Sequence, residues 1–351
     1  MRFVILLSIC LCYSLTVRSQ DKDPLLFKDR ATTEQWLNKM RIPALGIGYI
    51  KNGKIVSATV YGVLMKGSGK PAPSDAIFNV ASLTKPITAL VALKLIDEGK
   101  LELDEPLYKY WLDPDIANDT NAKKLTTRYI LSHRTGFANW RWKNQDKKLK
   151  FDFEPGTRFQ YSGEGFEYLR KAIEAKLGKP LEQLAEELVF KPVGMTRTRY
   201  YWDNGMKEER FARWHDSKGN VYELFKNTKA NAADDLLTTV EDYAKFLVYV
   251  MNGAGLSEKL YKEMTAEQIR LKNNKYWGLG WWIDELTTGD KIAMLHGGDD
   301  IGVHTMAIML PRSKQGLVIF TNSDNGTDAY IPVVLHHLGA SGQSVIDVET
   351  K

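Results

Sequence analysis

The chain has 351 residues, of which 44% are hydrophobic and 26% charged, and its formal net charge is +5. This composition is ordinary for a globular protein and allows a sizeable hydrophobic core. The small net charge, together with the lack of basic runs interleaved with aromatic residues in the sequence, argues against nucleic acid as a partner.

The first twenty residues have the profile of a secretory signal. Arg2 precedes an apolar run that ends near Tyr13, and polar residues follow before "DKDP". Cleavage near Ser19 or Gln20 would leave residues 21–351 as the mature chain. The apolar run is short for a bilayer-spanning helix, so we expect export to the periplasm or the extracellular space, with an uncleaved anchor as the alternative.

The same segment holds both cysteines, Cys10 and Cys12, so the mature chain would contain no thiol, no disulfide and no cysteine metal site. Loss of Arg2 and Arg18 from the 48 basic residues would leave 46 against 43 acidic ones, a net charge of +3. No later segment looks transmembrane. The mature chain is therefore predicted to have no integral membrane span, and its oligomeric state is left open.

The first third of the mature chain combines helical and strand patterns. A helix is predicted over about residues 33–40. The run "ALGIGYIKNGKIVSATVYGV" then contains two strand-like stretches around Asn52-Gly53, a strong hairpin signal. Over residues 82–99 the apolar side chains point almost all round a helix, which indicates a helix buried within the protein.

The middle, from about residue 101 to 235, alternates helical stretches with loops rich in proline, glycine and aromatic residues, and we predict a helical subdomain there. After a further helix, "TVEDYAKFLVYVMNG", strand character returns in "YWGLGWWID", "KIAMLHGG", "VHTMAIMLP" and "GLVIFTNS", and a last helix is expected near residues 330–338. Strands at both ends indicate one sheet closed by the two termini. The predicted fold class is α+β, an antiparallel sheet flanked by helices with an inserted all-helical subdomain.

The segment "NVASLTKPIT" places Lys85 three residues after Ser82. Pro86 is tolerated only near a helix start, so both residues are predicted in the first turn, with adjacent side chains on one face. A lysine flanked by apolar residues loses hydration, which lowers its pKa and lets it accept the proton of the serine hydroxyl. The helix N-terminus adds partial positive charge where an oxyanion would form. The alternative is a chance match, since Ser19 and Lys22 have the same spacing.

Two further elements follow along the chain. In "RFQYSGEGF", Tyr161 comes after an extended run and before a helix, where its phenol could relay protons to a leaving group; a core tyrosine is the simpler interpretation. In "AMLHGGDDIGV", His296, Gly297 and Gly298 end a predicted strand, and the glycines would let a ligand lie against the strand edge; a turn with a surface histidine is the alternative. The three elements are far more specific together than apart.

In this order and in these contexts, the chain resembles the serine β-lactamase and penicillin-binding-protein superfamily, most closely its class C β-lactamase-like branch of DD-peptidases, D-aminopeptidases and esterases. The resemblance covers nearly the whole mature chain and includes the softer patterns "ILSHRTGF", "LVFKPVGMTRTRY" and "LLTTVEDYAKFL". It implies a β-lactamase/transpeptidase-like fold and a hydrolase that works through an acyl-enzyme, with no metal and no cofactor.

The resemblance also implies a role for each matching residue. Ser82 matches the acylated nucleophile, and Lys85 matches the base beside it. Tyr161 matches the tyrosine of the second motif, which shares acid and base work with the lysine. His296 and Gly298 match the first and third positions of the Lys-Thr-Gly motif, in the His-x-Gly form that esterase-like and peptidase-like members show.

The backbone N–H groups of Ser82 and Asp299 would then form the oxyanion hole. Two positions depart from the β-lactamase pattern. Gly163 stands where these enzymes have the asparagine that holds the substrate's amide side chain, and His296 replaces the lysine that meets the substrate carboxylate. Both departures weaken the case for efficient β-lactam hydrolysis. His133 is interpreted as structural, because it precedes a helix-ending glycine.

These features predict an exported serine hydrolase for amide or ester substrates, preferably peptides or amides of D-amino acid character such as cell-wall fragments. A small-ester carboxylesterase is the main alternative. A slow-turnover penicillin-recognising sensor and an inactive scaffold with a fortuitous serine-lysine pair are two others. The expected partner is a small-molecule or peptide substrate.

Overall fold

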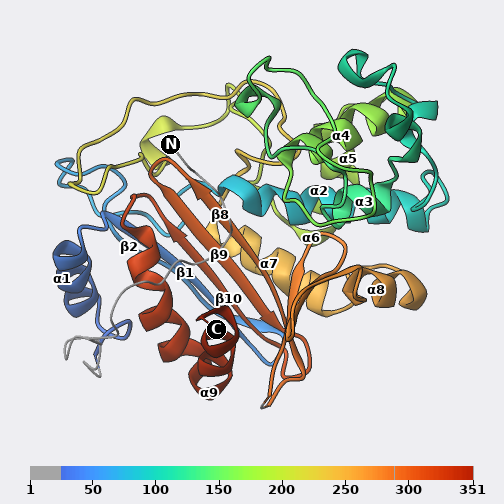
Figure 1. Cartoon of the computed structure of the whole chain (residues 1–351). Helices are drawn as coiled ribbons and strands as arrows, with labels where there is room; N and C mark the ends of the chain where they lie inside the picture. Colours follow the sequence, from blue (N-terminus) through green and yellow to red (C-terminus); the bar gives the residue numbers. More distant parts are fainter. Residues whose placement is uncertain (1–24, 288, 351) are drawn as a thin grey trace.

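The computed structural model describes residues 25–287 and 289–350, and an antiparallel sheet runs through its centre (Figure 1). The eight described strands of this sheet follow the order β2-β1-β10-β9-β8-β7-β6-β5. Their bounds are β1 Ala44–Lys51, β2 Lys54–Gly62, β5 Ile269–Lys272, β6 Lys275–Trp277, β7 Trp282–Glu285, β8 Ile292–Asp300, β9 Val303–Leu310 and β10 Gln315–Thr321. β3 (Phe78–Asn79) and β4 (Leu237–Thr238) form a separate antiparallel pair. The predicted signal segment, residues 1–20 with both cysteines, lies outside the described residues.

The first and last strands of the chain meet within the sheet. β1 pairs with β2 on one side and with β10 on the other, where Ile47 lies opposite Ile319. Asn52 and Gly53 turn the β1–β2 hairpin with φ values of 52° and 71°, the positive values that a tight two-residue turn requires. The predicted hairpin and the closure of one sheet by both ends of the chain are confirmed.

Helices cover both faces of the sheet (Figure 1). α1 (Arg30–Met40) and α9 (Tyr330–Thr350) lie on one face, where Trp36, Leu37 and Val333 join apolar residues of β1, β9 and β10 in one core. α7 (Val240–Met251) packs against β1, β2 and β10 on the other face. The remaining described helices are α2 Thr84–Asp97, α3 Thr127–Leu131, α4 Gly163–Leu177, α5 Leu181–Ala185, α6 Lys191–Val193 and α8 Glu258–Thr265. This arrangement confirms the predicted fold class.

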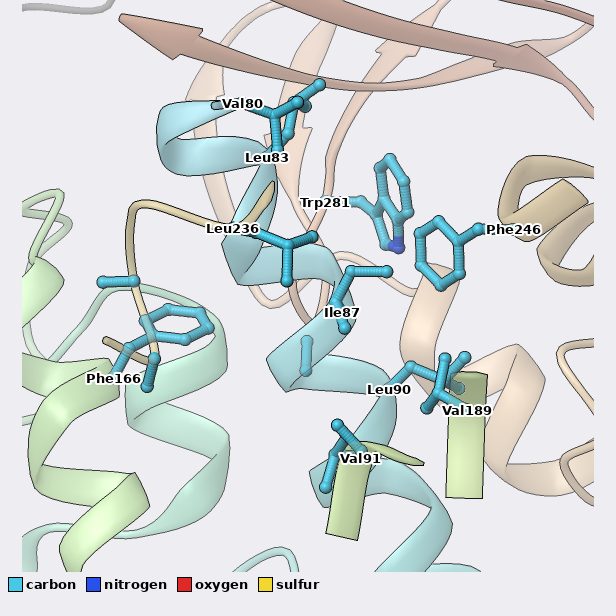
Figure 2. Close-up of a cluster of buried hydrophobic side chains, with 14 of the residues drawn as sticks. Val80, Leu83, Ile87, Leu90, Val91, Phe166, Val189, Leu236, Phe246 and Trp281 are labelled. Atoms are coloured by element: carbon cyan, nitrogen blue, oxygen red, sulfur yellow. The ribbon is translucent and has the colours of Figure 1, made fainter. Parts of the chain in front are cut away.

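α2 is buried on all sides, as its sequence pattern predicts. Every side chain from Thr84 to Leu93 is buried. Figure 2 shows Phe166 on one side of the helix and Trp281 and Phe246 on the other. Burying one such large apolar side chain is worth about 1.5–3 kcal/mol, so the contacts around α2 fix its position firmly. One detail of the prediction is wrong: Ser82 lies in a 3-10 turn, Ala81–Leu83, that precedes the α-helix.

Three other stretches differ from the sequence prediction. The run "YWGLGWWID" is not one strand, because Gly280 adopts a φ of 86° and donates its N–H to the carbonyl of Leu131, which separates β6 from β7. The last α-helix of the middle stretch is α6, and apart from a 3-10 helix at Glu208–Arg210 residues 195–236 are mostly loop. The last helix continues to Thr350 beyond a kink at Gly339. Within the described part of the chain, none of the helices combines the length and apolarity needed to cross a membrane.

A buried carboxyl group lies on β7. Asp284 is fully buried, and neither of its carboxylate oxygens has a hydrogen-bond partner among the described residues. Burial, and after it the Glu349 carboxylate, raise the pKa of Asp284 to about 9, while Lys275 acts in the opposite direction. The folded protein therefore holds a proton on Asp284 at neutral pH, where the unfolded chain would release it.

We expect Asp284→Asn to flatten the pH dependence of stability. Between about pH 4 and pH 9 the folded state binds one proton more than the unfolded state, so raising the pH in this window lowers the free energy of unfolding by up to about 1.4 kcal/mol per unit. Asparagine removes this term. Urea unfolding at about pH 5 and about pH 8 would measure it, with the exposed Asp347→Asn as the control. Equal pH dependence in Asp284→Asn and the unsubstituted protein would contradict the prediction.

Candidate active site

The structure brings Ser82 and Lys85 together at the start of α2. Lys85 Nζ donates to Ser82 Oγ at 2.8 Å and to the carbonyl oxygen of Ala233 at 2.8 Å. The Lys85 side chain is buried, whereas Ser82 is partly exposed. A substrate can therefore reach the hydroxyl group, while the amine beside it is shielded from water.

The amine of Lys85 is poised to lose its proton near neutral pH. Burial lowers its pKa to about 7, and the Asp234 carboxylate opposes this shift. The Tyr161 ring centre lies 4.6 Å from Nζ and adds an aromatic face rather than a counter-ion. The lowered pKa expected from the sequence is confirmed, and a neutral amine at this position can accept the proton of Ser82.

The backbone immediately before Ser82 is held in an unusual conformation. Ala81 has a φ of 46°, in the left-handed region that alanine rarely adopts. Its N–H donates to Asn79 Oδ1 at 2.8 Å, and its carbonyl accepts from the Thr84 hydroxyl at 2.6 Å. These two side chains stabilise a turn that presents Ser82 outward, and such held strain is concentrated at functional sites.

Strand β8 lies directly against this turn because residue 298 is glycine. A Cβ there would lie 2.3 Å from the carbonyl oxygen of Val80 and 2.3 Å from Thr305 Oγ1, which itself donates to Val80 at 2.9 Å. Asp299 follows, with an exposed side chain 3.2 Å from His304 Nδ1. The sequence interpretation gave Gly298 a role at the strand edge. The geometry gives Gly298 a second role, because it lets β8 approach closely the turn Ala81–Leu83. This turn carries Ser82, the predicted nucleophile, and is called the nucleophile turn below.

His296 is buried in β8 and is neutral. Its Nδ1 lies 2.8 Å from the carbonyl oxygen of Gly297, so Nδ1 carries the hydrogen and Nε2 is an acceptor without a partner in the described structure. Burial, and after it Lys85, lower the pKa of His296 to about 3. A neutral imidazole does not offer a substrate carboxylate the positive charge of a lysine.

Tyr161 approaches Lys85 from the helical side of the site. Its hydroxyl oxygen is buried and has no hydrogen-bond partner within residues 25–287 and 289–350. Burial raises the pKa of Tyr161 far above its usual value of 10, and the nearby Ser82 hydroxyl opposes this shift only in part. Tyr161 therefore stays protonated and can donate a proton, whereas Lys85 is the better base.

His133 supports Tyr161 from behind. The two rings stack with centres 4.2 Å apart, and Nδ1 of the fully buried His133 accepts the N–H of Ser162 at 3.0 Å. Burial lowers the pKa of His133 well below 6.5, so the ring is neutral. His133 thus fixes both the ring of Tyr161 and the next peptide bond. The sequence pattern marked His133 only as a residue at a helix end, because the stacking depends on the fold.

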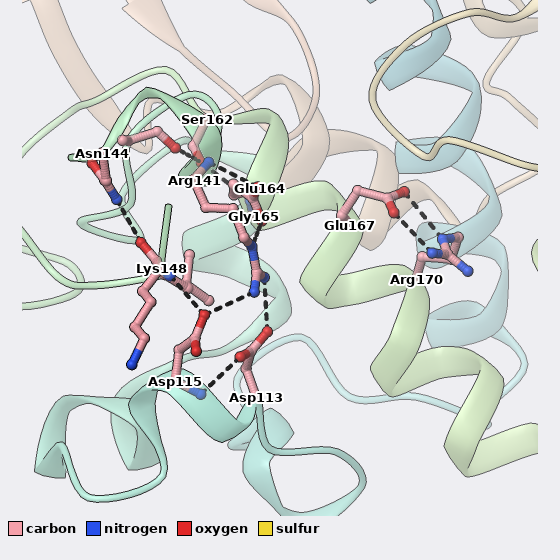
Figure 3. Close-up of polar contacts among 12 residues, drawn as sticks. Asp113, Asp115, Arg141, Asn144, Lys148, Ser162, Glu164, Gly165, Glu167 and Arg170 are labelled. Atoms are coloured by element: carbon pink, nitrogen blue, oxygen red, sulfur yellow. Dashed lines mark hydrogen bonds and ion pairs between the residues drawn. The ribbon is translucent and has the colours of Figure 1, made fainter. Parts of the chain in front are cut away.

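An ion-pair network anchors the segment that carries Tyr161 (Figure 3). Arg141 contacts Asp113, Asp115 and Glu164 at 2.7, 3.2 and 2.9 Å. The Asp113 and Glu164 side chains are only 2% and 8% exposed, so these pairs are shielded from water, unlike ordinary surface salt bridges. The network joins the loop around residue 141 to the first turn of α4, directly after Tyr161.

The place of the β-lactamase asparagine is filled by an indole. A Cβ on Gly163 would lie 2.7 Å from the ring of Trp140, and the Gly163 N–H donates to Asn139 Oδ1 at 2.8 Å. An asparagine at position 163 therefore does not fit unless Trp140 moves. The departure seen in the sequence coincides with close packing of Trp140, from the neighbouring loop, against Gly163, which local sequence patterns do not reveal.

Three carboxylates gather beside Lys85. Oxygen atoms of Asp234, Asp235 and Asp300 lie within 4.8 Å of one another, and Asn79 and Asn227 donate to Asp235 at 2.9 and 3.2 Å. Burial, and after it the neighbouring Asp235, raise the pKa of Asp234 to about 8. Such oxygen atoms suit a hard divalent cation as ligands, although the hydrogen bonds from Asn79 and Asn227 already occupy the carboxyl group of Asp235. The sequence analysis missed this cluster because only the fold joins residues 234 and 300.

Comparison with known proteins decides the family. A sequence model described as Beta-lactamase matches residues 30–336. The chain belongs to the beta-lactamase family. Esterase EstB of Burkholderia gladioli is 28% identical over 233 residues, which are 58% of each chain. Protein flp of Staphylococcus aureus strain COL is 22% identical over 334 residues, which are 87% of this chain and 64% of flp. The beta-lactamase-family chain thus spans about three fifths of the length of these two relatives.

Solved structures support the same fold. The octameric penicillin-binding protein homologue from Pyrococcus abyssi aligns with a TM-score of 0.73 at 22% identity, covering 88% of this chain and 76% of that one. D-alanine carboxypeptidase AmpC from Burkholderia cenocepacia aligns with a TM-score of 0.73 at 19% identity, covering 88% and 98%. At these identities the likeness establishes the fold of this beta-lactamase-family protein.

All six residues that the sequence singled out lie around one site. Lys85 bonds to Ser82, the Tyr161 ring lies over Lys85, and the Tyr161 and His296 ring centres are 6.3 Å apart. Gly298 and Asp299 continue β8 past the nucleophile turn. The N–H groups of Ser82 and Asp299 stay a prediction for the oxyanion hole.

We expect Asp234→Asn to move the acid limb of the reaction of Ser82 to lower pH. When it is ionised, the Asp234 carboxylate raises the pKa of Lys85 against the effect of burial, so its loss should lower that pKa. Reaction should rise through about pH 7 in the unsubstituted protein and at lower pH in the variant. The labelling rate of Ser82 by a fluorophosphonate, followed from about pH 5 to about pH 9, measures both.

Asp203→Asn removes an exposed carboxylate and is the control for this pH profile. Its acid limb should coincide with that of the unsubstituted protein. An unmoved limb in Asp234→Asn would contradict the prediction, and a shift to higher pH would also contradict the assignment of Lys85 as the base.

Proposed function

We propose that this protein is an exported serine hydrolase that forms an acyl-enzyme on amide or ester substrates. The observation that carries the proposal is the 2.8 Å contact between Lys85 Nζ and Ser82 Oγ, made by an amine whose pKa is lowered to about 7. A serine beside a neutral amine is an activated nucleophile. Export rests on the signal profile of residues 1–20.

The proposed reaction has two halves. In the first, Ser82 Oγ attacks the substrate carbonyl as its proton moves to Lys85, and the carbonyl π electrons pass to oxygen. The tetrahedral intermediate then expels the amine or alcohol, which takes a proton from the Tyr161 hydroxyl, and Lys85 returns a proton to Tyr161. In the second half, Lys85 accepts a proton from water, water attacks the acyl ester, and Ser82 leaves with that proton.

The oxyanion of both intermediates would be stabilised by the N–H groups of Ser82 and Asp299. Support comes from the contact at Gly298, because it holds β8 against the turn that carries Ser82. The positive end of α2 lies next to the same place. Together these donors would supply the charge stabilisation that the neutral side chains around the site do not.

For the substrate we infer a peptide or amide of D-amino acid character whose scissile residue carries no carboxylate. The neutral His296 offers no cation to a carboxylate, and the oxygen atoms of Asp234, Asp235 and Asp300 can accept hydrogen bonds from an amine but not from a carboxylate. The D-configuration rests on the family resemblance. D-alanine carboxypeptidase AmpC, which shares the fold, is named for its action on D-alanine.

A small-ester carboxylesterase is the second candidate. One relative in sequence is Esterase EstB, and a neutral His296 suits an uncharged ester equally well. A slow-turnover penicillin-recognising protein is the third, because Trp140 occupies the place of the asparagine that would hold the amide side chain of a β-lactam.

Replacing the nucleophile should abolish covalent chemistry. Ser82→Ala should lower turnover by at least about a thousandfold and prevent labelling by a fluorophosphonate, because no other hydroxyl group is paired with Lys85 among the described residues. Intact-protein mass spectrometry and thermal unfolding measure labelling and folding. Ser217→Ala, at an exposed turn, is the control. Full labelling of Ser82→Ala would contradict the assignment of Ser82 as the nucleophile.

A substrate panel should separate the candidates. We expect D-alanine p-nitroanilide, which has a free amine, to be hydrolysed about tenfold or more faster than a D-alanyl-D-alanine peptide with a free carboxylate. Rapid hydrolysis of p-nitrophenyl butyrate without action on either D-amide would favour the esterase. A benzylpenicillin adduct that persists for hours with negligible product release would favour the sensor.

A further inference from the structure

The last turn of α9 reaches the strands next to the active site. Glu349 is 8% exposed, and its Oε1 lies 2.5 Å from Lys275 Nζ on β6 and accepts the indole N–H of Trp282 on β7 at 3.1 Å. Lys275 is 13% exposed, and its Nζ lies 5.2 Å from the centre of the Trp282 ring. One buried carboxylate therefore binds a cation and an indole at once.

Trp282 connects this cluster to the active-site strand. It lies opposite Leu295 in the β7–β8 ladder, and its ring centre is 5.7 Å from that of His296. A Cβ on Gly297 would lie 3.6 Å from the Trp282 ring, so the indole also packs against the backbone between His296 and Gly298. The indole therefore packs against the part of β8 that contacts the nucleophile turn, and a shift of the indole would shift this part of the strand.

We propose that Glu349 is a positioning residue for this hydrolase: its carboxylate fixes the Trp282 indole, and the indole holds His296 and β8 in place beside Ser82. This inference rests on the proposed function, since it concerns the same site. It assigns a role in the active site to the end of the C-terminal helix, which the family motifs do not reach.

The charges around Glu349 favour this role. Two titratable side chains face it, Lys275 from β6 and Asp284 from β7. Burial keeps Asp284 protonated at neutral pH, so Asp284 does not compete with Glu349 for the amine of Lys275. Because the carboxylate is nearly buried, its loss would leave an indole N–H and an ammonium group without partners, which is costly in a shielded position.

Two substitutions separate positioning from stability. Glu349→Gln and Glu349→Ala both break the ion pair with Lys275, so both should lower the melting temperature. Only glutamine keeps an oxygen that can accept the Trp282 N–H. We therefore expect Glu349→Ala to lower kcat/KM for p-nitrophenyl butyrate by about tenfold or more, and Glu349→Gln to stay within about threefold of the unsubstituted protein.

Two controls make the comparison specific. Asp347→Asn removes a carboxylate from the same last turn, where Asp347 is exposed and accepts from Gln343, and should change neither property. In a Trp282→Phe background the indole N–H no longer exists, so Glu349→Ala should cause no further loss of kcat/KM. Equal losses in Glu349→Ala and Glu349→Gln, no loss in either, or an undiminished effect in the Trp282→Phe background would overturn the proposal.

A readout without turnover keeps the inference distinct from the proposed function. If the unsubstituted protein hydrolyses neither the esters nor the D-amides of the panel and takes up no fluorophosphonate, the proposed function fails. The position of His296 is then read from its ring resonances in NMR spectra. A shift of these resonances in Glu349→Ala but not in Glu349→Gln supports the positioning relation, and unchanged resonances in both overturn it.

Discussion

The burial of one lysine amine is the constraint on which this structure depends. Lys85 lies in a helix that is apolar on every side, and among the described residues its amine donates hydrogen bonds to Ser82 and to the Ala233 carbonyl. A charged ammonium group in such surroundings has a high desolvation free energy, so the pKa of the amine falls to about 7 and the amine loses its proton near neutral pH. The apolar packing of α2 thereby creates the base, and the nearby carboxylates tune it.

Three other polar side chains of the site, His133, Tyr161 and His296, are uncharged. His133 and His296 are neutral because they are buried, and Tyr161 remains a phenol for the same reason. Each has one ring nitrogen or hydroxyl without a partner in the described structure. Such unsatisfied groups are costly in a core, so each calls for an explanation. The uncharged groups fit the neutral reacting group of the proposed substrate, and Lys85 and Asp234 are the titrating groups beside them.

Local sequence patterns predicted the elements that a short stretch of sequence determines by itself. The Asn52-Gly53 hairpin and the all-apolar α2 follow from turn chemistry and helical periodicity, and the serine-lysine spacing follows from helix geometry. Features that depend on contacts between distant segments were missed. The indole of Trp140 over Gly163 and the reach of Glu349 to β7 are set by packing across loops and helices, which periodicity does not encode.

The pairing of β1 with β10 also governs when the chain can fold during its synthesis. β1 leaves the ribosome more than two hundred residues before β10, its partner. Until β10 is made, the edge of β1 that will pair with it has unpaired backbone N–H and C=O groups, and these groups can pair with strands of other chains. A chain of this topology completes its sheet only after β10 (Gln315–Thr321) has been synthesised. Early translation termination, rather than most point substitutions, should therefore be the main source of aggregated product.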